Sequence, residues 1–346
     1  MALTSHFRVG AGLDAAAEML RLPYSKDKEG RRIMLKQCKP NAKGEYAELT
    51  EEEWKKFEHY GIVDTKLLRD IYYMLPPLPA AERWAWEWTF KRNLKGIKLD
   101  MDLVKELNDI VDSSMPRYVK EFEHCTGYKA TINSPVKCKE FFQQYYPEIE
   151  DMQADTLRDL LLDKRYVPPH VRRALEIKDL AGSTSIAKIK TALKQNYNGR
   201  IYGNLAYAHT QTKRWAGRGI QVQNFPRVDD KRPDKISFDL DSQSIVESIR
   251  GIRSELQDPI GFSKNLLRRI FLPDQGKYFY CGDWSKIEPT VLFWLTGQGT
   301  IPGNWYEDMA ATIYSVDIST IGKESEERQL GKSAALGCGY GMGHQK

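Results

Sequence analysis

The sequence has no long apolar run and no recognisable export signal. No stretch of about 18 or more apolar residues occurs, so a transmembrane helix is not expected. The opening residues, MALTSHFR, lack the basic start and apolar core of a secretory signal. These absences argue against a membrane-spanning or secreted protein and favour an intracellular one.

Cysteine is scarce and scattered. The five cysteines form no Cys-x-x-Cys pair, and none has a histidine at the spacing of a zinc site. His124 beside Cys125 comes nearest, but adjacent residues rarely bind one metal. An odd, dispersed set predicts reduced thiols, at Cys38, Cys125, Cys138, Cys281 and Cys338.

Charge of one sign is also in short supply. The net charge of +5 is compatible with a polyanionic partner without being diagnostic of one. A length of 346 residues predicts two or three domains, and 41% hydrophobic residues suffice for a buried core. Eight tryptophans and 18 tyrosines can supply stacking surfaces as well as core.

Helical spacing of apolar residues runs through most of the chain. A helix is expected from about residue 51, and Pro76, Pro77 and Pro79 should end it and mark a domain boundary. Asp100 follows a turn and can cap a long helix, because its carboxylate can accept from the first free amides. Further helices are predicted over 13–22, 101–123, 134–146, 155–162, 170–180, 186–195 and 328–336, with strands over 236–238 and 278–281.

An aspartate follows the second predicted strand, in the run YFYCGDWSKIE. A strand end fixes a carboxylate while the following turn leaves coordination positions open, so Asp283 could hold a divalent metal. The alternative is that Asp283 only caps the helix expected around 291–295. On this segment alone, capping is the commoner outcome.

A stripe of residues recurs every four positions near the end of the sequence. Arg328 and Lys332 lie one helical turn apart, and two such cations can hold a triphosphate. Leu336 and Tyr340 continue the stripe, where the aromatic could meet a base or a sugar. The alternative is a solvated surface pair. This alternative is weakened by the small residues nearby, which suit close approach by a ligand or DNA. They are Gly331, Ser333, Ala334, Ala335 and Gly337.

Together the two segments resemble the family A DNA polymerases, typified by DNA polymerase I, with a bacteriophage character. The family's metal-binding motif DYSQIE is matched by DWSKIE, from Asp283 to Glu288. Its fingers-helix motif RxxxKxxxFxxxYG is matched from Arg328 to Gly341. Both motifs occur in the family's order at a compatible separation, which makes the pair far more specific than either motif alone.

Other segments extend the resemblance over nearly the whole chain. TKRW at 212–215 followed by QNFPR at 223–227 is similar to the family segment that contacts primer and template. INSP at 132–135 and GIKLD at 96–100 are similar to segments at the thumb and at the entrance to the palm.

The resemblance implies two-metal phosphoryl transfer, in which magnesium ions clamp the attacking and leaving oxygens. Asp283 would be one metal-bridging carboxylate, and the Trp284 carbonyl would coordinate the nucleotide-side ion. Arg328 and Lys332 would hold the incoming triphosphate. Lys332 would also be placed to protonate the departing pyrophosphate.

Further roles around the nucleotide follow from the same resemblance. Glu288 and Tyr340 would pack beneath the sugar and crowd out a ribose 2′-hydroxyl. Leu336 replaces the usual aromatic, so base stacking should differ. Tyr306 stands where many relatives carry a histidine against the triphosphate, and a phenol can hydrogen-bond a phosphate. Lys286 replaces the motif's glutamine, as in phage-type relatives.

The resemblance also implies contacts with DNA. Arg214, Gln223 and Asn224 would read minor-groove acceptors common to all base pairs, which suits a sequence-independent enzyme. The alternatives are an ordinary surface pair for Arg214 and a buried amide network for the other two. Lys213 stands where the family commonly has glycine, and PT at 289–290 replaces the usual LR.

An exonuclease remnant is expected upstream. Tyr60 and Asp64 fit the short YxxxD motif that closes the family's proofreading exonuclease, one domain ahead of the palm. The Asp-x-Glu metal pair of that domain would be expected well over a hundred residues before Tyr60, ahead of the first residue of this sequence. The second catalytic aspartate of the palm would lie well beyond Tyr340.

Three hypotheses account for this pattern. One is a split polymerase, in which partner polypeptides supply the second catalytic aspartate and the rest of the exonuclease. Another is an incomplete gene product. The third is a catalytically inactive subunit that binds primer–template DNA, but the retention of Asp283, Glu288, Arg328 and Lys332 argues against it.

The predicted fold class is α+β, a right-hand polymerase fragment of thumb, partial palm and partial fingers. The expected domains are the end of an exonuclease-like domain (1–80), palm entrance and helical thumb (81–200), palm with the metal motif (201–300) and partial fingers (301–346). The expected ligands are primer–template DNA, deoxynucleoside triphosphates and two Mg²⁺ ions. The expected location is the cytoplasm, that of a bacterial host if a phage encodes the chain.

Overall fold

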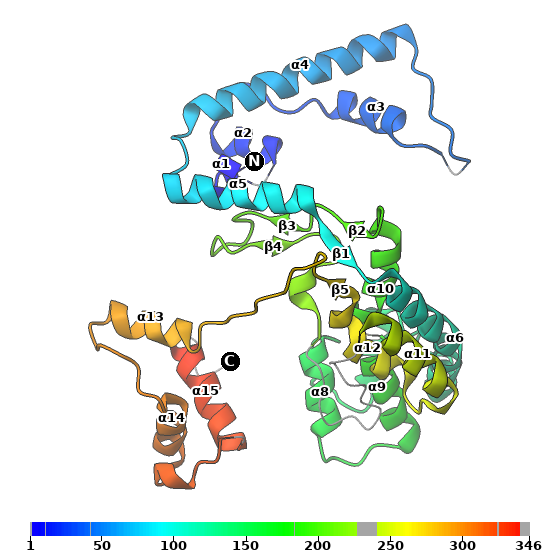
Figure 1. The fold of residues 1–346 in the computed structure, drawn as a ribbon, viewed down its shortest axis with the longest axis vertical. Coiled ribbons are helices and arrows are strands. Elements are labelled where there is room, and N and C mark those ends of the chain that lie inside the picture. The colour runs from blue at the N-terminus through cyan, green and yellow to red at the C-terminus, as the bar shows by residue number, and fades with distance from the viewer. Residues whose placement is uncertain are drawn as a thin grey trace. The chain divides into compact units, whose positions relative to one another are not determined.

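The computed structural model describes residues 2–10, 12–41, 43–182, 184–226, 241–323 and 325–339. The chain divides into two compact units, Met1–Lys277 and Tyr278–Lys346. Helices dominate, and the few strands are short (Figure 1). The α+β fold class expected from the sequence is confirmed.

The first unit opens with helices gathered along α4. A capping box starts α4, because Thr50 Oγ1 accepts from the Glu53 amide while the Glu53 carboxylate accepts from the Thr50 amide. The helix ends before the three prolines, as predicted. The bounds are α1 Ala2–Phe7, α2 Leu13–Met19, α3 Lys28–Cys38, α4 Glu51–Met74 and α5 Ala80–Lys95.

A three-stranded antiparallel sheet leads into α6. Its central strand β1 (Ile97–Leu99) pairs on one side with β2 (Arg200–Ile201) and on the other with β5 (Phe271–Leu272). Asp100 follows β1, and its carboxylate accepts from the Leu103 amide at 3.0 Å to start α6 (Met101–Cys125). The predicted capping of a long helix by Asp100 is confirmed.

The helical body of the first unit is built around α6, against which α9, α10, α11 and α12 pack (Figure 1). Phe122, Phe142, Tyr146 and Phe262 are among the largest fully buried side chains of its core. The predicted helices all occur, with some ends shifted by a few residues. The bounds are α7 Pro135–Phe142, α8 Ala154–Leu162, α9 Pro169–Ala181, α10 Thr184–Gln195, α11 Ser242–Ile252 and α12 Pro259–Leu266.

The second unit consists of α13 (Ile287–Leu295), α14 (Trp305–Tyr314) and α15 (Glu326–Gly339), with a short 3₁₀ turn at Ile318–Thr320. α15 packs along α14 and also contacts α13. Among the residues that the structure describes, no helix is both long and apolar enough to cross a membrane.

The strand predicted over 278–281 is wrong. The segment is extended but has no strand partner in the described ranges, and the side chain of Tyr280 is 93% exposed. An apolar run forms a strand only where a neighbouring strand pairs with its backbone through hydrogen bonds. Sequence periodicity carries no information about that neighbouring strand. The strand predicted over 236–238 lies outside the described residues.

Candidate functional site

Asp283 lies in an exposed extended segment at the start of the second unit. Helix α13 begins only at Ile287, and its N-cap residue is Lys286, whose backbone is left-handed (φ 55°). Asp283 is therefore not the cap of this helix, and that alternative is wrong. Its carboxylate makes no hydrogen bond or ion pair with any other described residue. Trp284 beside it is 81% exposed.

Lys286 ties the turn after Asp283 to the start of α14. The Lys286 ammonium donates to the carbonyl of Gly303 and lies 5.3 Å from the ring centroid of Tyr306. A cation over an aromatic face is attracted by the ring quadrupole. Lys286 therefore connects the DWSKIE turn to Gly303 and Tyr306 at the start of α14.

Tyr306 is buried, 7% exposed, and lies between two cations. The Arg328 guanidinium carbon is 5.6 Å from the Tyr306 ring centroid, and Arg328 Nε donates to Glu307 Oε1 at 2.5 Å. Burial raises the pKa of Tyr306, an effect that the Arg328 charge opposes and the Glu288 charge reinforces. The Arg328 hydrogen bond lowers the pKa of Glu307. Tyr306 thus stays a protonated phenol at neutral pH.

Arg328 and Lys332 keep donors available for a ligand. No other described residue accepts from the two terminal nitrogens of Arg328, although its Nε is engaged by Glu307. Lys332, one turn along α15, is half-buried and has no hydrogen bond or ion pair in the described part of the chain. Leu336 is half-buried on the same helix. Tyr340 lies outside the described residues.

The small residues of α15 serve helix packing. A Cβ atom on Gly331 would lie 2.4 Å from the Tyr306 carbonyl oxygen and 2.7 Å from the Ala310 amide nitrogen. Ala335 is buried as well. The expectation that these residues leave room for a ligand is therefore wrong at Gly331, where the space is filled by the backbone of α14.

The predicted DNA contacts lie on a hairpin and turn of the first unit. Arg214 is exposed just before β4 (Ala216–Gly217), which pairs with β3 (Leu205–Ala206). Gln223 and Asn224 lie in the 3₁₀ turn Val222–Asn224, and both are exposed. The alternative of a buried amide network is therefore wrong. Exposed amides are what groove reading would require.

Two cations that were not predicted from the sequence donate hydrogen bonds to the backbone carbonyls of this turn. The Lys188 ammonium donates to the carbonyl of Asn224 and lies 4.8 Å from the ring centroid of Phe225. Arg268 donates to the carbonyls of Phe225, at 2.9 Å, and Pro226, at 2.8 Å. Burial lowers the pKa of Lys188, as does the Arg268 charge. These two side chains fix the backbone that carries the exposed amides.

Tyr60 and Asp64 lie together on α4 and share one cation. The Lys26 ammonium is 3.2 Å from Asp64 Oδ2 and 5.5 Å from the Tyr60 ring centroid. Tyr60 is buried, and a Cβ on Gly30 would lie 2.4 Å from its Cβ. This pair is a packed, internally neutralised contact between α4 and the segment before α3.

The metal-binding capacity of the described residues is limited. No group of three or more His, Cys, Asp or Glu side chains converges in those ranges. The unpartnered carboxylate of Asp283 and the backbone carbonyl of Trp284 are hard oxygen donors of the kind magnesium prefers. They fit as part of a ligand set.

Solved structures show what class of fold this is. The chain matches the POL domain of Pol1 from M. smegmatis, described in complex with DNA primer–template and dNTP, with a TM-score of 0.52 and 16% identity. The match covers 99% of this chain and 54% of that chain. The fold is that of a DNA polymerase domain.

Sequence comparison identifies the relatives. A DNA polymerase of Bacillus phage SP02 is 30% identical over 95% of the chain. The chain spans about half the length of this curated relative, 52% of it. No family model matches the sequence. The chain is similar over most of its length to a bacteriophage DNA polymerase and has the fold of a polymerase domain, and the resemblance stated from the two motifs is confirmed.

Proposed function

We propose that this chain takes part in template-directed DNA synthesis. In this reaction the primer 3′-oxygen attacks the α-phosphorus of a deoxynucleoside triphosphate, the α–β phosphoanhydride bond breaks, and pyrophosphate leaves. The carrying observation is an unpartnered Asp283 carboxylate in the same compact unit as two cations of α15 that keep donors available. The kinship with a phage DNA polymerase supports the assignment.

The second unit would bind the nucleotide. Arg328 would offer its two terminal nitrogens to the phosphates while Glu307 holds its Nε. Lys332 would contact the same triphosphate and protonate the departing pyrophosphate oxygen. The Tyr306 phenol would donate a hydrogen bond to a phosphate oxygen, and Glu288 would pack beneath the sugar with Tyr340. Leu336 would face the base.

Asp283 would serve as a metal-bridging carboxylate together with the carbonyl of Trp284. Magnesium would neutralise the charge that develops on the phosphoryl oxygens. Two-metal transfer uses more than one carboxylate, and we propose that a partner polypeptide supplies a further catalytic aspartate.

The first unit would bind the primer–template. Arg214, Gln223 and Asn224 are exposed and would read minor-groove acceptors, with their turn held by Lys188 and Arg268. We also propose the domain division at residues 80, 200 and 300, with Tyr60 and Asp64 as the remnant of an exonuclease-like domain.

Primer extension tests this function. The chain is assayed with a primer–template, deoxynucleotides and Mg²⁺, alone and mixed with the products of neighbouring genes. We expect extension in the mixture, reduced at least about 100-fold by Asp283→Asn, because an electrostatic stabiliser of the transition state is lost. Asp308→Asn, which changes a half-buried carboxylate in the first turn of α14 of the same unit, is the control and should leave extension unchanged.

Other outcomes separate the hypotheses. Extension by the chain alone would contradict the need for a partner polypeptide. DNA binding without extension in any mixture would favour a binding subunit that has lost catalysis.

A further inference from the structure

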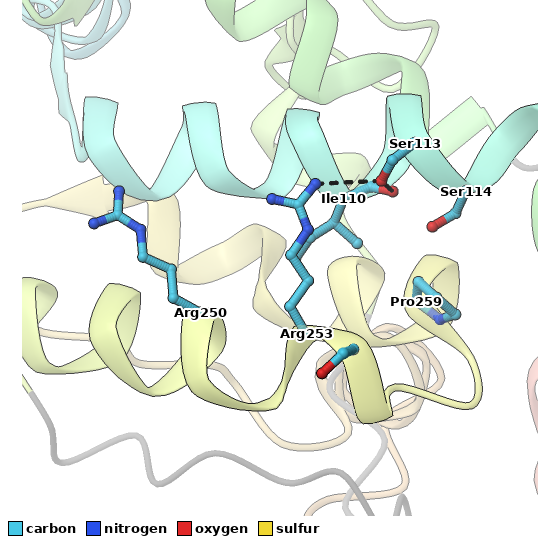
Figure 2. Close-up of a pocket in the computed structure, with 7 residues that line it drawn as sticks. Ile110, Ser113, Ser114, Arg250, Arg253 and Pro259 are labelled. Carbon is cyan, nitrogen blue, oxygen red and sulfur yellow. Dashed lines mark hydrogen bonds between the residues drawn. The ribbon is translucent and has the colours of Figure 1, made fainter.

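A polar hollow lies between α6 and the end of α11 in the first unit. Its volume is about 450 Å³. Both arginines of its lining reach from the α11 side towards α6 (Figure 2). The lining residues are Ile110, Ser113, Ser114, Arg250, Arg253, Ser254 and Pro259.

One buried carboxylate orients both arginines. The Glu106 side chain is 6% exposed, and its two oxygens accept separately from Arg250 Nε at 2.9 Å and from an Arg253 terminal nitrogen at 3.2 Å. The other terminal nitrogen of Arg253 donates to the Asp109 carbonyl at 2.9 Å and to Ser113 Oγ at 3.2 Å. Two guanidinium groups thus share one carboxylate, which leaves one excess positive charge at the hollow.

Donors remain free after these contacts are made. Arg250 uses only its Nε, so no described residue accepts from its two terminal nitrogens, and its side chain is 64% exposed. The hydroxyls of Ser114 and Ser254 likewise have no hydrogen-bond partner in the described ranges. A fixed guanidinium with two parallel free donors, beside hydroxyls, is the arrangement that recognises a tetrahedral oxyanion.

We propose that this hollow binds a backbone phosphate of a DNA strand, as a contact separate from the nucleotide site. The choice of DNA as the source of the phosphate rests on the proposed function. Arg250 provides the paired donors, Arg253 the second charge, and Glu106 is the positioning residue that holds both guanidinium groups towards the solvent. A hollow of this volume admits a phosphate together with its flanking sugar.

Salt-dependent binding of duplex DNA to the full chain tests the site. Each phosphate neutralised by a protein cation adds roughly 0.9 to the slope of log affinity against log salt concentration. Arg250→Gln should therefore make the slope shallower by about one and weaken binding several-fold at low salt. Arg69→Gln is the matched control, because Arg69 is 60% exposed and also pairs with a single carboxylate, that of Asp70. Its slope should equal that of the wild type.

The result that overturns the site is an unchanged slope for a folded Arg250→Gln protein. Binding of inorganic phosphate at Arg250, together with a DNA salt slope that Arg250→Gln leaves unchanged, also overturns the proposal. The hollow would then hold a free anion and not a DNA phosphate. Asp283→Asn keeps this test independent of catalysis. That variant should lose extension yet retain the wild-type slope, so the failure of one proposal is visible without the other.

Discussion

The two units differ most in how they use their apolar residues. In the first unit, α6 and its neighbours surround one continuous core, with Phe122 and Phe142 fully buried. In the second unit, Phe293 and Tyr306 are buried, but Tyr280 and Trp294 are 93% and 73% exposed. The described contacts of the second unit are mainly those between its own helices.

The charged motif residues also differ between the two units. In the first unit the motif residue Asp64 pairs through Oδ2 with the Lys26 ammonium, which also lies near the Tyr60 ring. In the second unit the Asp283 carboxylate and the Lys332 ammonium have no partner in the described ranges. A solvated charge without a protein partner remains available to a ligand, whereas a paired charge is already neutralised.

The largest expected effect would come from removing core side chains of the first unit. Phe142→Ala should lower the free energy of unfolding by about 3–5 kcal/mol, because it leaves a cavity in a closely packed core. Trp294→Ala in the second unit should change it by less than about 0.5 kcal/mol. Urea unfolding measures both. Equal losses would contradict the contrast between the units.

The next largest effects are expected from one glycine-to-alanine substitution in each unit. Gly331→Ala should destabilise the second unit by about 1–3 kcal/mol, because its Cβ would meet the backbone of α14. Gly61→Ala, in the middle of α4, has no atom within 4 Å of the new Cβ and should stabilise its helix by up to about 1 kcal/mol. Hydrogen exchange of amides in α14 and α4 reports each effect, and a stabilising Gly331→Ala would refute the close helix contact.

The smallest expected effect is a pH dependence of the contact between α14 and α15 in the second unit. The pKa of Glu307 is lowered from its ordinary value near 4.5 by Arg328. This contribution to stability is present above that value and is lost as the pH falls through the lower folded-state pKa. The protection factors of amides in α14 and α15, taken relative to the intrinsic exchange rate at each pH, should therefore fall as the pH drops below the ordinary value. Glu307→Gln should remove this acid-dependent part, and an unchanged profile would show that the contact is not stabilising.

Local signals in the sequence predicted much of the first unit. The prolines after α4, the cap at Asp100 and the periodicity of α6 all act within a few residues, so the sequence alone contains them. The prediction of a strand over 278–281 was wrong because strand formation depends on a neighbouring strand to pair with. The use of Gly331 against α14 was missed for a similar reason, since close approach depends on which helix lies opposite.

Long-range contacts were beyond the sequence at the candidate sites too. Lys188 and Arg268 lie far along the chain from the turn whose carbonyls they hold, and nothing in their local pattern marks them. The pairing of Arg328 with Glu307 likewise joins two helices. The motifs indicated candidate site residues in the second unit, whereas the partners of those residues came only from the structure.

The most direct test of the account is whether Asp283 and Lys332 act on one nucleotide. The affinity for a deoxynucleoside triphosphate, with Mg²⁺ and primer–template, is measured in the extension-competent mixture for Asp283→Asn, Lys332→Gln and the double variant. Groups that share a ligand should show a coupling free energy of about 0.5–3 kcal/mol. Losses that add to within about 0.3 kcal/mol would place the two side chains at separate sites and contradict the proposed nucleotide site.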